Sequence, residues 1–196
     1  MGEIKSSWEI ALEKTKNIQA DKSILEANNY RTEGKKLVSR FLENTSIELE
    51  KELKAFEPNQ VQWVKEGMFE TLMSHIVLPQ DPGAHEKLKH LTTGFKAVLG
   101  SNPKIKMIFE QLAGFFKEYT EQKEGLRSAI ERQYAPKLEQ KRRALSQKLG
   151  RDVPLEPESD PEFVQFFRQN MAQFDSQYQD VLDQAKEELK KMLKEN

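Results

Sequence analysis

The sequence predicts an all-α fold: an elongated helical bundle with a compact helical head and a long helical hairpin or coiled-coil arm. Glu, Lys, Gln and Leu dominate the 196 residues, and charged residues make up 32% of them. Such residues form helices readily. Two segments, 102–149 and 160–196, meet no helix breaker except Pro136. Helices of that length, about 70 Å and 50 Å at 1.5 Å per residue, are too long for a small globule.

The N-terminal region, residues 1–57, is expected to form two long helices that pack on the arm. A 4-3-4-3 spacing that places five residues on one face predicts the first helix over residues 3–19: Ile4, Trp8, Ala11, Thr15 and Ile18. The second is expected to begin at Asp21 or Ser23, where Ser23 and Glu26 form a capping box, and to continue to Phe56. Leu42, Leu49 and Phe56 are spaced by seven residues, as in a coiled coil.

Residues 58–116 are predicted to form the compact helical head. Pro58 ends the preceding helix and Asn59 caps the next, which spans the most apolar segment, residues 60–78. A loop is expected at residues 79–83 and a short helix at 84–99. Gly100 stops that helix, and Asn102 or Ser101 followed by Pro103 starts the next.

Residues 117–196 are predicted to form the long helical hairpin, with the linker at residues 150–160. Pro136 is expected to kink or split the first helix. Asp160 and Pro161 give the second helix its N-cap and its first-turn proline. Two heptad series predict its buried face: Val164, Met171, Tyr178, Ala185 and Met192, and Phe167, Phe174 and Val181. The three regions are expected to fold as one cooperative unit.

No catalytic, metal or cofactor motif is recognisable in the sequence. Cysteine is absent, so thiolate chemistry and disulfides are excluded. His85 and His90 stand five residues apart, whereas a zinc-binding helix needs histidines four apart on one face. Phosphate-loop and dinucleotide glycine patterns are missing. We therefore expect a protein that is not an enzyme, with no cofactor and no metal.

One basic cluster is the strongest candidate interaction patch: Lys137, Lys141, Arg142, Arg143, Lys148 and Arg151. It suits a phosphate backbone or an acidic partner. Nearer acids lie in the linker, at Glu156, Glu158, Asp160 and Glu162, so a solvated hairpin tip is favoured. In an antiparallel hairpin Phe163 and Phe166 are expected near Leu145 and Leu149, which leaves aromatic surface for a partner.

The opening of the chain resembles a group of uncharacterised bacterial proteins. The resemblance rests on Met-Gly-Glu-Ile-Lys-Ser at residues 1–6 and Glu-Ile-Ala-Leu-Glu-Lys-Thr at residues 9–15. It implies a bacterial source and a native N-terminus. It implies no activity and no site residues.

These observations favour a non-enzymatic helical scaffold or adaptor that acts through protein–protein interaction. Three alternatives stay open: a stalk-like subunit of a larger complex, a small-molecule binder or enzyme using the apolar head, and nucleic-acid binding through residues 137–151. A protein partner or self-association is expected. The formal net charge of −1 makes nucleic acid a poor general partner. No transmembrane segment or secretion signal is recognisable, so a cytoplasmic location is predicted.

Overall fold

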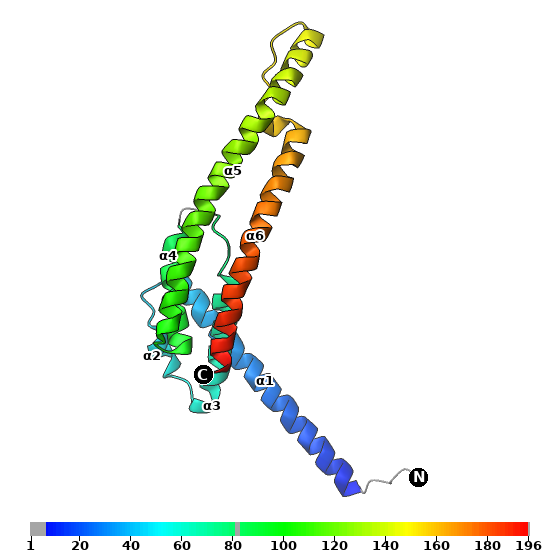
Figure 1. Cartoon of the computed structure of the whole chain (residues 1–196). Helices are drawn as coiled ribbons and strands as arrows, with labels where there is room; N and C mark the ends of the chain where they lie inside the picture. Colours follow the sequence, from blue (N-terminus) through cyan, green and yellow to red (C-terminus); the bar gives the residue numbers. More distant parts are fainter. Residues whose placement is uncertain (1–6, 81–82, 196) are drawn as a thin grey trace. The chain divides into compact units, whose positions relative to one another are not determined.

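The protein is all-α in its computed structural model (Figure 1). The structure describes the backbone of residues 7–80 and 83–195, and their side chains except those of 7–21 and 85. The helices are α1 (Ser7–Glu43), α2 (Leu49–Leu53), α3 (Pro58–Ser74), α4 (Ala84–Leu99), α5 (Pro103–Leu149) and α6 (Pro161–Lys194), with a short 3-10 helix at Pro157–Ser159. No strand occurs in these ranges. The predicted all-α class is therefore confirmed.

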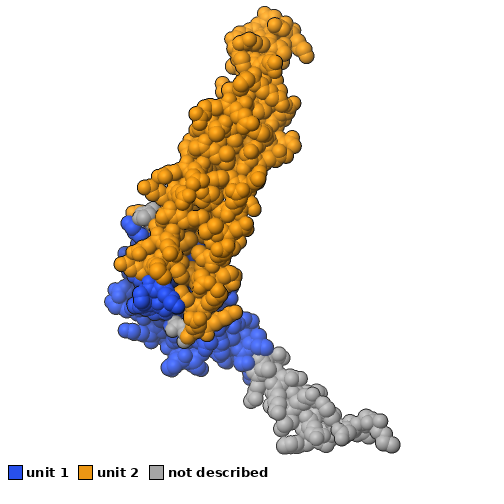
Figure 2. Space-filling view, in the orientation of Figure 1, with its two compact units in different colours: residues 1–76, 89–105 blue, residues 77–88, 106–196 orange. Residues whose placement is uncertain are grey.

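The chain forms two compact units, coloured separately in Figure 2. Unit 1 comprises residues 1–76 and 89–105, and unit 2 comprises residues 77–88 and 106–196. The sequence predicted three regions, with boundaries at 57/58 and 116/117. Neither boundary coincides with a boundary between the two units. That division, and the packing of residues 1–57 on the arm, stay predictions.

Unit 1 is built on a close contact between α1 and α3. Gly34 of α1 lies against the Val64 carbonyl of α3, and Gly67 of α3 lies against the Arg31 carbonyl of α1. A Cβ at either glycine would collide with that backbone. Ion pairs flank the contact, with Arg31–Glu66 at 2.7 Å and Lys35–Glu70 at 2.8 Å. Gly34 therefore marks a helix crossing that only glycine permits, not a tolerated glycine in an open helix face.

α1 differs from the two helices expected at the N-terminus. It continues without interruption through Asp21 and Ser23 and then ends at Glu43, well before Phe56. The helix stops at Asn44, whose Oδ1 accepts a hydrogen bond from the Ser46 amide at 3.1 Å. This Asx turn removes Asn44 from the helix. Leu42 and Leu49 consequently lie in different helices, and the predicted seven-residue series is wrong. Ile4 lies outside the described residues, as do the side chains of Trp8, Ala11, Thr15 and Ile18.

The remaining helix boundaries follow local capping chemistry. Glu57, not Asn59, caps α3 in a capping box with Gln60, and Pro58 occupies the first turn. The bounds predicted for α4 are confirmed. Gly100 adopts a φ of +77° after it, and the Asn102 side chain accepts from the Lys104 amide at 2.9 Å to start α5. These boundaries depend on adjacent residues alone, which is why sequence reading finds most of them.

In unit 2, α5 and α6 form an antiparallel pair joined by the linker 150–160. α5 runs as one helix through Pro136, so the predicted split does not occur. Gly150 ends α5 with a φ of +67°, and Asp160 caps α6, as predicted. The linker folds back along α5, which places the start of α6 opposite Tyr134 and not opposite Leu149. Within the described residues, no helix is long and apolar enough to cross a membrane.

The buried face of α6 differs in part from the two predicted heptad series. Leu182 and Leu189 are fully buried, whereas Val181 is 48% exposed. The residues of the first series, Val164 to Met192, are partly or fully buried. A straight helix with 3.6 residues per turn drifts relative to a strict seven-residue repeat. The buried position of the second series therefore passes from Val181 to the next residue, Leu182.

Candidate functional site

Two clusters of one tyrosine, one lysine and one aspartate join α5 to α6. In the Tyr119 cluster, the Tyr119 hydroxyl donates to Asp175 at 2.7 Å, and Lys123 Nζ lies 2.6 Å from that hydroxyl and 3.3 Å from Asp175. In the Tyr134 cluster, the hydroxyl donates to Asp160 at 2.9 Å, and Lys141 Nζ lies 2.7 Å from Asp160.

The two clusters share one helix register. Tyr134 follows Tyr119 by fifteen residues, and Asp160 precedes Asp175 by fifteen, which is about four helical turns. Both tyrosine rings are buried. Each cluster therefore satisfies a buried hydroxyl with a charge pair and fixes the alignment of the two helices.

Burial and hydrogen bonds shift the pKa values of Tyr119, Lys123 and Asp160 in the two clusters. Burial raises the pKa of Tyr119. Burial alone would lower the pKa of Lys123, but its hydrogen bonds to Tyr119 and Asp175 outweigh that effect and raise it. The hydrogen bond from Lys141 holds the pKa of Asp160 below its usual value. In each cluster, hydrogen bonds thus connect the tyrosine hydroxyl, the lysine and the aspartate.

We expect Tyr119→Phe to lower the free energy of unfolding by about 1–2 kcal/mol, because the hydroxyl bonds a charged carboxylate in a buried position. Tyr178→Phe is the matched control. Its ring packs against that of Phe174, with the centroids 4.7 Å apart and the ring planes tilted by 40°. Among the described residues no hydrogen bond of its hydroxyl is seen, and we expect a change within about 0.5 kcal/mol. Urea unfolding measures both. Equal effects would show that the Tyr119 hydroxyl contributes nothing specific.

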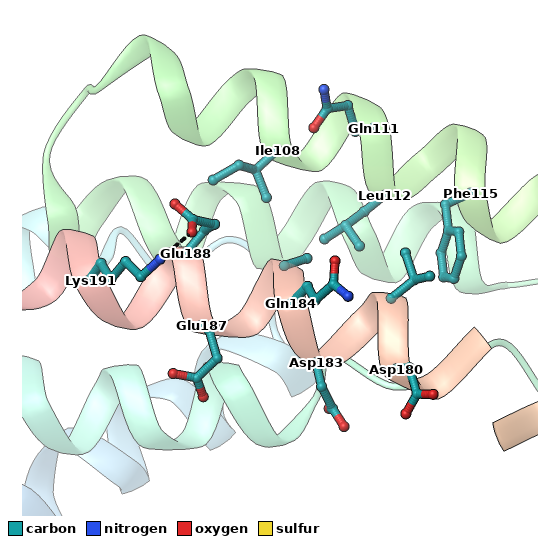
Figure 3. A pocket seen from close by; sticks show the side chains of 12 residues that line it. Ile108, Gln111, Leu112, Phe115, Asp180, Asp183, Gln184, Glu187, Glu188 and Lys191 are labelled. Carbon is teal, nitrogen blue, oxygen red and sulfur yellow. Dashed lines mark hydrogen bonds and ion pairs between the residues drawn. The ribbon is translucent and has the colours of Figure 1, made fainter. Parts of the chain in front are cut away.

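A groove of about 860 Å³ lies between α5 and α6 (Figure 3). We call it the α5–α6 groove. Ile108, Leu112 and Phe115 of α5 and Val181 and Ala185 of α6 form its apolar floor. Leu112 is 4% exposed, whereas Val181 at the floor's edge is 48% exposed. The groove is therefore open to solvent and offers uncovered apolar surface.

Carboxylates border the α6 side of this groove. Its lining holds four carboxylates and one ammonium group: Asp180, Asp183, Glu187, Glu188 and Lys191. Glu188 pairs with Lys191, drawn as a dashed line in Figure 3, and Glu187 pairs with Lys190 at 2.6 Å. The hydrogen bond from Lys190 lowers the pKa of Glu187. Asp180 has no ion-pair partner in the described part of the chain. The border of the groove is therefore acidic at neutral pH.

The basic cluster predicted from the sequence is largely engaged within the chain. Lys137 pairs with Glu162 at 2.6 Å, and Lys141 bonds Asp160. Arg142 and Arg143 both bind Glu139, at 2.9 Å and 2.8 Å, and Arg142 also reaches Asp152. The two arginines lower the pKa of Glu139 to about 2. Lys148 and Arg151 are exposed and have no ion-pair partner among the described residues.

Two acids of the linker region, Asp160 and Glu162, are among the residues that engage this basic cluster. The arrangement supports the interpretation as a hairpin tip with its own counter-charges. Use of the cluster as an interaction patch stays a prediction, now centred on Lys148 and Arg151.

The expected position of the two phenylalanines near Leu145 and Leu149 is wrong. Phe163 is 5% exposed and packs with Ile130 and Tyr134, with its ring centroid 5.2 Å from that of Tyr134. Phe166 is half-buried beside the same tyrosine, at 6.1 Å. The difference arises because the linker returns along α5 before α6 begins. Phe163 thus belongs to a buried cluster of unit 2, and the partly buried Phe166 packs against that cluster.

Sequence reasoning missed the α5–α6 groove, although one signal pointed to it. Asp180, Asp183 and Glu187 recur at a 3-4 spacing beside the apolar Val181 and Ala185. That pattern describes an acidic stripe next to an apolar one, but it does not reveal that α5 leaves the apolar stripe uncovered. Among the described residues, no group of three or more His, Asp or Glu side chains is arranged to hold a metal ion.

Comparison with known proteins places the chain in a family. A family model matches residues 50–191, which include α3 to α5 and most of α6. The chain belongs to a family of unknown function, DUF6657. The match includes the α5–α6 groove and both tyrosine clusters, and it confirms the expected membership of an uncharacterised family. No curated protein and no solved structure matches the chain.

Proposed function

We propose that this protein is a non-enzymatic helical scaffold or adaptor that binds a helix of a partner protein in the α5–α6 groove. The observation that carries the proposal is the groove of about 860 Å³, whose apolar floor is uncovered and lies beside a row of carboxylates. Uncovered apolar surface with a polar border is typical of interaction sites. A groove between two antiparallel helices suits a third helix, which would complete a three-helix contact.

The groove favours a partner helix of one chemistry. Apolar side chains at positions i, i+3 or i+4 and i+7 would contact Ile108, Phe115 and Val181. Lys or Arg residues beside them would face Asp180, Asp183 and Glu187. Opposite charges along the border would set the orientation of the helix and speed its association. We therefore propose an amphipathic helix with basic flanks as the occupant.

The proposal also includes three predictions that rest on the sequence alone. They are a cytoplasmic location, a bacterial source and coiled-coil-like pairing of helices. In the alternative function, as a stalk-like subunit of a larger complex, the protein would use the same groove to bind its neighbour in that complex. A second copy of the chain is an alternative occupant, which size-exclusion chromatography with light scattering would detect.

Binding of model peptides to the full chain tests the proposal. The probe is a labelled Leu/Lys amphipathic peptide of about 18 residues, five helical turns, and its control is the same peptide with Glu in place of Lys. We expect fluorescence anisotropy to show saturable binding of the Leu/Lys peptide and at least tenfold weaker binding of the Leu/Glu peptide.

Variants of the floor locate the binding. Val181→Gln combined with Ile108→Gln should weaken binding of the Leu/Lys peptide at least tenfold, because apolar contact is lost while the charge of the groove is unchanged. Leu149→Gln is the matched control: Leu149 is 53% exposed but lies outside the groove, and its substitution should leave affinity within twofold. Failure of the Leu/Lys peptide to bind, or equal loss in both variants, would contradict the proposal.

A further inference from the structure

A second hollow, of about 440 Å³, lies in unit 2 beside the Tyr119 cluster. Its apolar wall consists of Pro79, Phe167 and Met171, and its polar wall includes Lys123, Glu124 and Arg127 of α5. Lys123, Phe167 and Met171 are each partly buried, so the hollow reaches below the surface of the helix pair. Its volume lies within the range of sites for small molecules.

The Tyr134 cluster provides an internal comparison. It has the same three residue types, and aromatic rings pack on the tyrosine of both clusters, but Asp160 is only 4% exposed. At the Tyr119 cluster, Asp175 is 38% exposed, whereas the two lysines are similarly exposed, at 27% for Lys123 and 31% for Lys141. The two clusters connect the helices in the same way, and Tyr119 and Lys123 of the Tyr119 cluster line this hollow.

The polar wall of the hollow has hydrogen-bond donors that the protein's own hydrogen bonds do not use. An ammonium group has three donors, and Lys123 uses two of them, toward Tyr119 and Asp175. Arg127 has five donors and bonds Glu131 through Nε at 3.1 Å. Among the described residues that line the hollow, Glu124 is the one carboxylate. Two cationic side chains and one carboxylate therefore line one wall in the described structure, and apolar side chains form the other.

We propose that this hollow binds a small apolar molecule that carries one carboxylate. The carboxylate would accept hydrogen bonds from Lys123 and Arg127, and the apolar body would lie against Phe167 and Met171. Charge-assisted hydrogen bonds from lysine and arginine to carboxylates are shorter and stronger than neutral ones. The site is independent of the helix-binding groove, because the two hollows share no residue.

Titration of the full chain with octanoate tests the proposal, with octanamide as the neutral analogue of equal length. The methyl resonance of Met171, observed with methyl-labelled methionine, reports binding inside the hollow, and calorimetry gives the Kd. We expect octanoate to shift this resonance saturably and to bind at least tenfold more tightly than octanamide. Equal binding of the two, or no shift of Met171, would overturn the proposal.

Matched variants separate binding from stability. Lys123→Met and Lys141→Met each remove the ammonium group of one tyrosine cluster, so both should lose similar stability. We expect Lys123→Met to weaken octanoate binding at least tenfold. We expect Lys141→Met to leave the Kd for octanoate within twofold of the wild-type value. Thr120→Phe, at an exposed position that lines the hollow, should block binding while both clusters stay intact. Equal weakening by the two lysine variants, or normal binding to Thr120→Phe, would overturn the proposal.

Discussion

Gly67→Ala is expected to lower the free energy of unfolding by about 3 kcal/mol, at the upper end of the range for overpacking. The new methyl group would fall on the backbone of Arg31, with the Arg31 carbonyl carbon 2.7 Å from it. Backbone atoms cannot rotate away as a side chain can, so α1 and α3 would have to separate. The separation would also disturb the stacking of Tyr30 on Trp63, whose centroids lie 6.1 Å apart.

Gly114→Ala supplies the control for this prediction. Gly114 also lies inside a helix, but a Cβ there meets no atom within 4 Å. Alanine favours the helix over glycine by about 0.5–1 kcal/mol, so this variant should be more stable than the wild type. Circular dichroism in urea measures both proteins. A Gly67→Ala protein of wild-type stability would contradict the close approach of α1 and α3.

Asp160→Ala is expected to lower the free energy of unfolding by about 2–4 kcal/mol. The carboxylate caps α6 by accepting from the Glu162 amide at 3.1 Å, and loss of a cap costs about 1 kcal/mol. It also accepts from Tyr134 and Lys141. Leaving these donors without their partner adds about 1–3 kcal/mol. Asp152→Ala removes an aspartate that is 80% exposed, and its effect should stay within about 0.5 kcal/mol.

The effect of Asp160→Ala should depend on pH with a defined sign. The hydrogen bond from Lys141 lowers the pKa of Asp160 in the folded protein. Its ionic contribution is therefore fully present above the unfolded pKa of about 4 and is lost as pH falls through the folded pKa. The stability difference between Asp160→Ala and the wild type should shrink from pH 7 to pH 2.5. A constant difference would show that the charge of Asp160 has no part in it.

Local chemistry explains which parts of the fold could be predicted. Gly100, Asn102, Gly150 and Asp160 each mark a helix end through their own backbone or side chain, and the structure uses all four. Asp21 and Ser23 offer the same kind of cap, but α1 passes through them. A capping residue allows a helix to start; it does not force the preceding helix to stop. The overlooked stop was Asn44, followed by Thr45 and Ser46, a polar group of the kind that ends helices.

Contacts between helices explain what could not be predicted. Nothing near Gly34 or Gly67 in the sequence shows that each faces a backbone carbonyl of the other helix. The tyrosine clusters join residues 56 and 26 positions apart, so their pairing depends on the helix register. That register depends on how far the linker folds back, which composition does not reveal. The groove is visible only once the register is known, because α5 and α6 both contribute to its floor.

Site-specific photo-crosslinking in cells that express the protein natively tests the central claim most directly. A photoreactive amino acid replaces Val181 in the groove or, as the control, Glu121 on an exposed part of α5. The account predicts that position 181 crosslinks to a helix with an apolar stripe and basic flanks in one partner protein. It also predicts that Asp180→Lys with Asp183→Lys abolishes the product and that position 121 gives none. Crosslinks that are equal at both positions, or that survive the charge reversal, would contradict it.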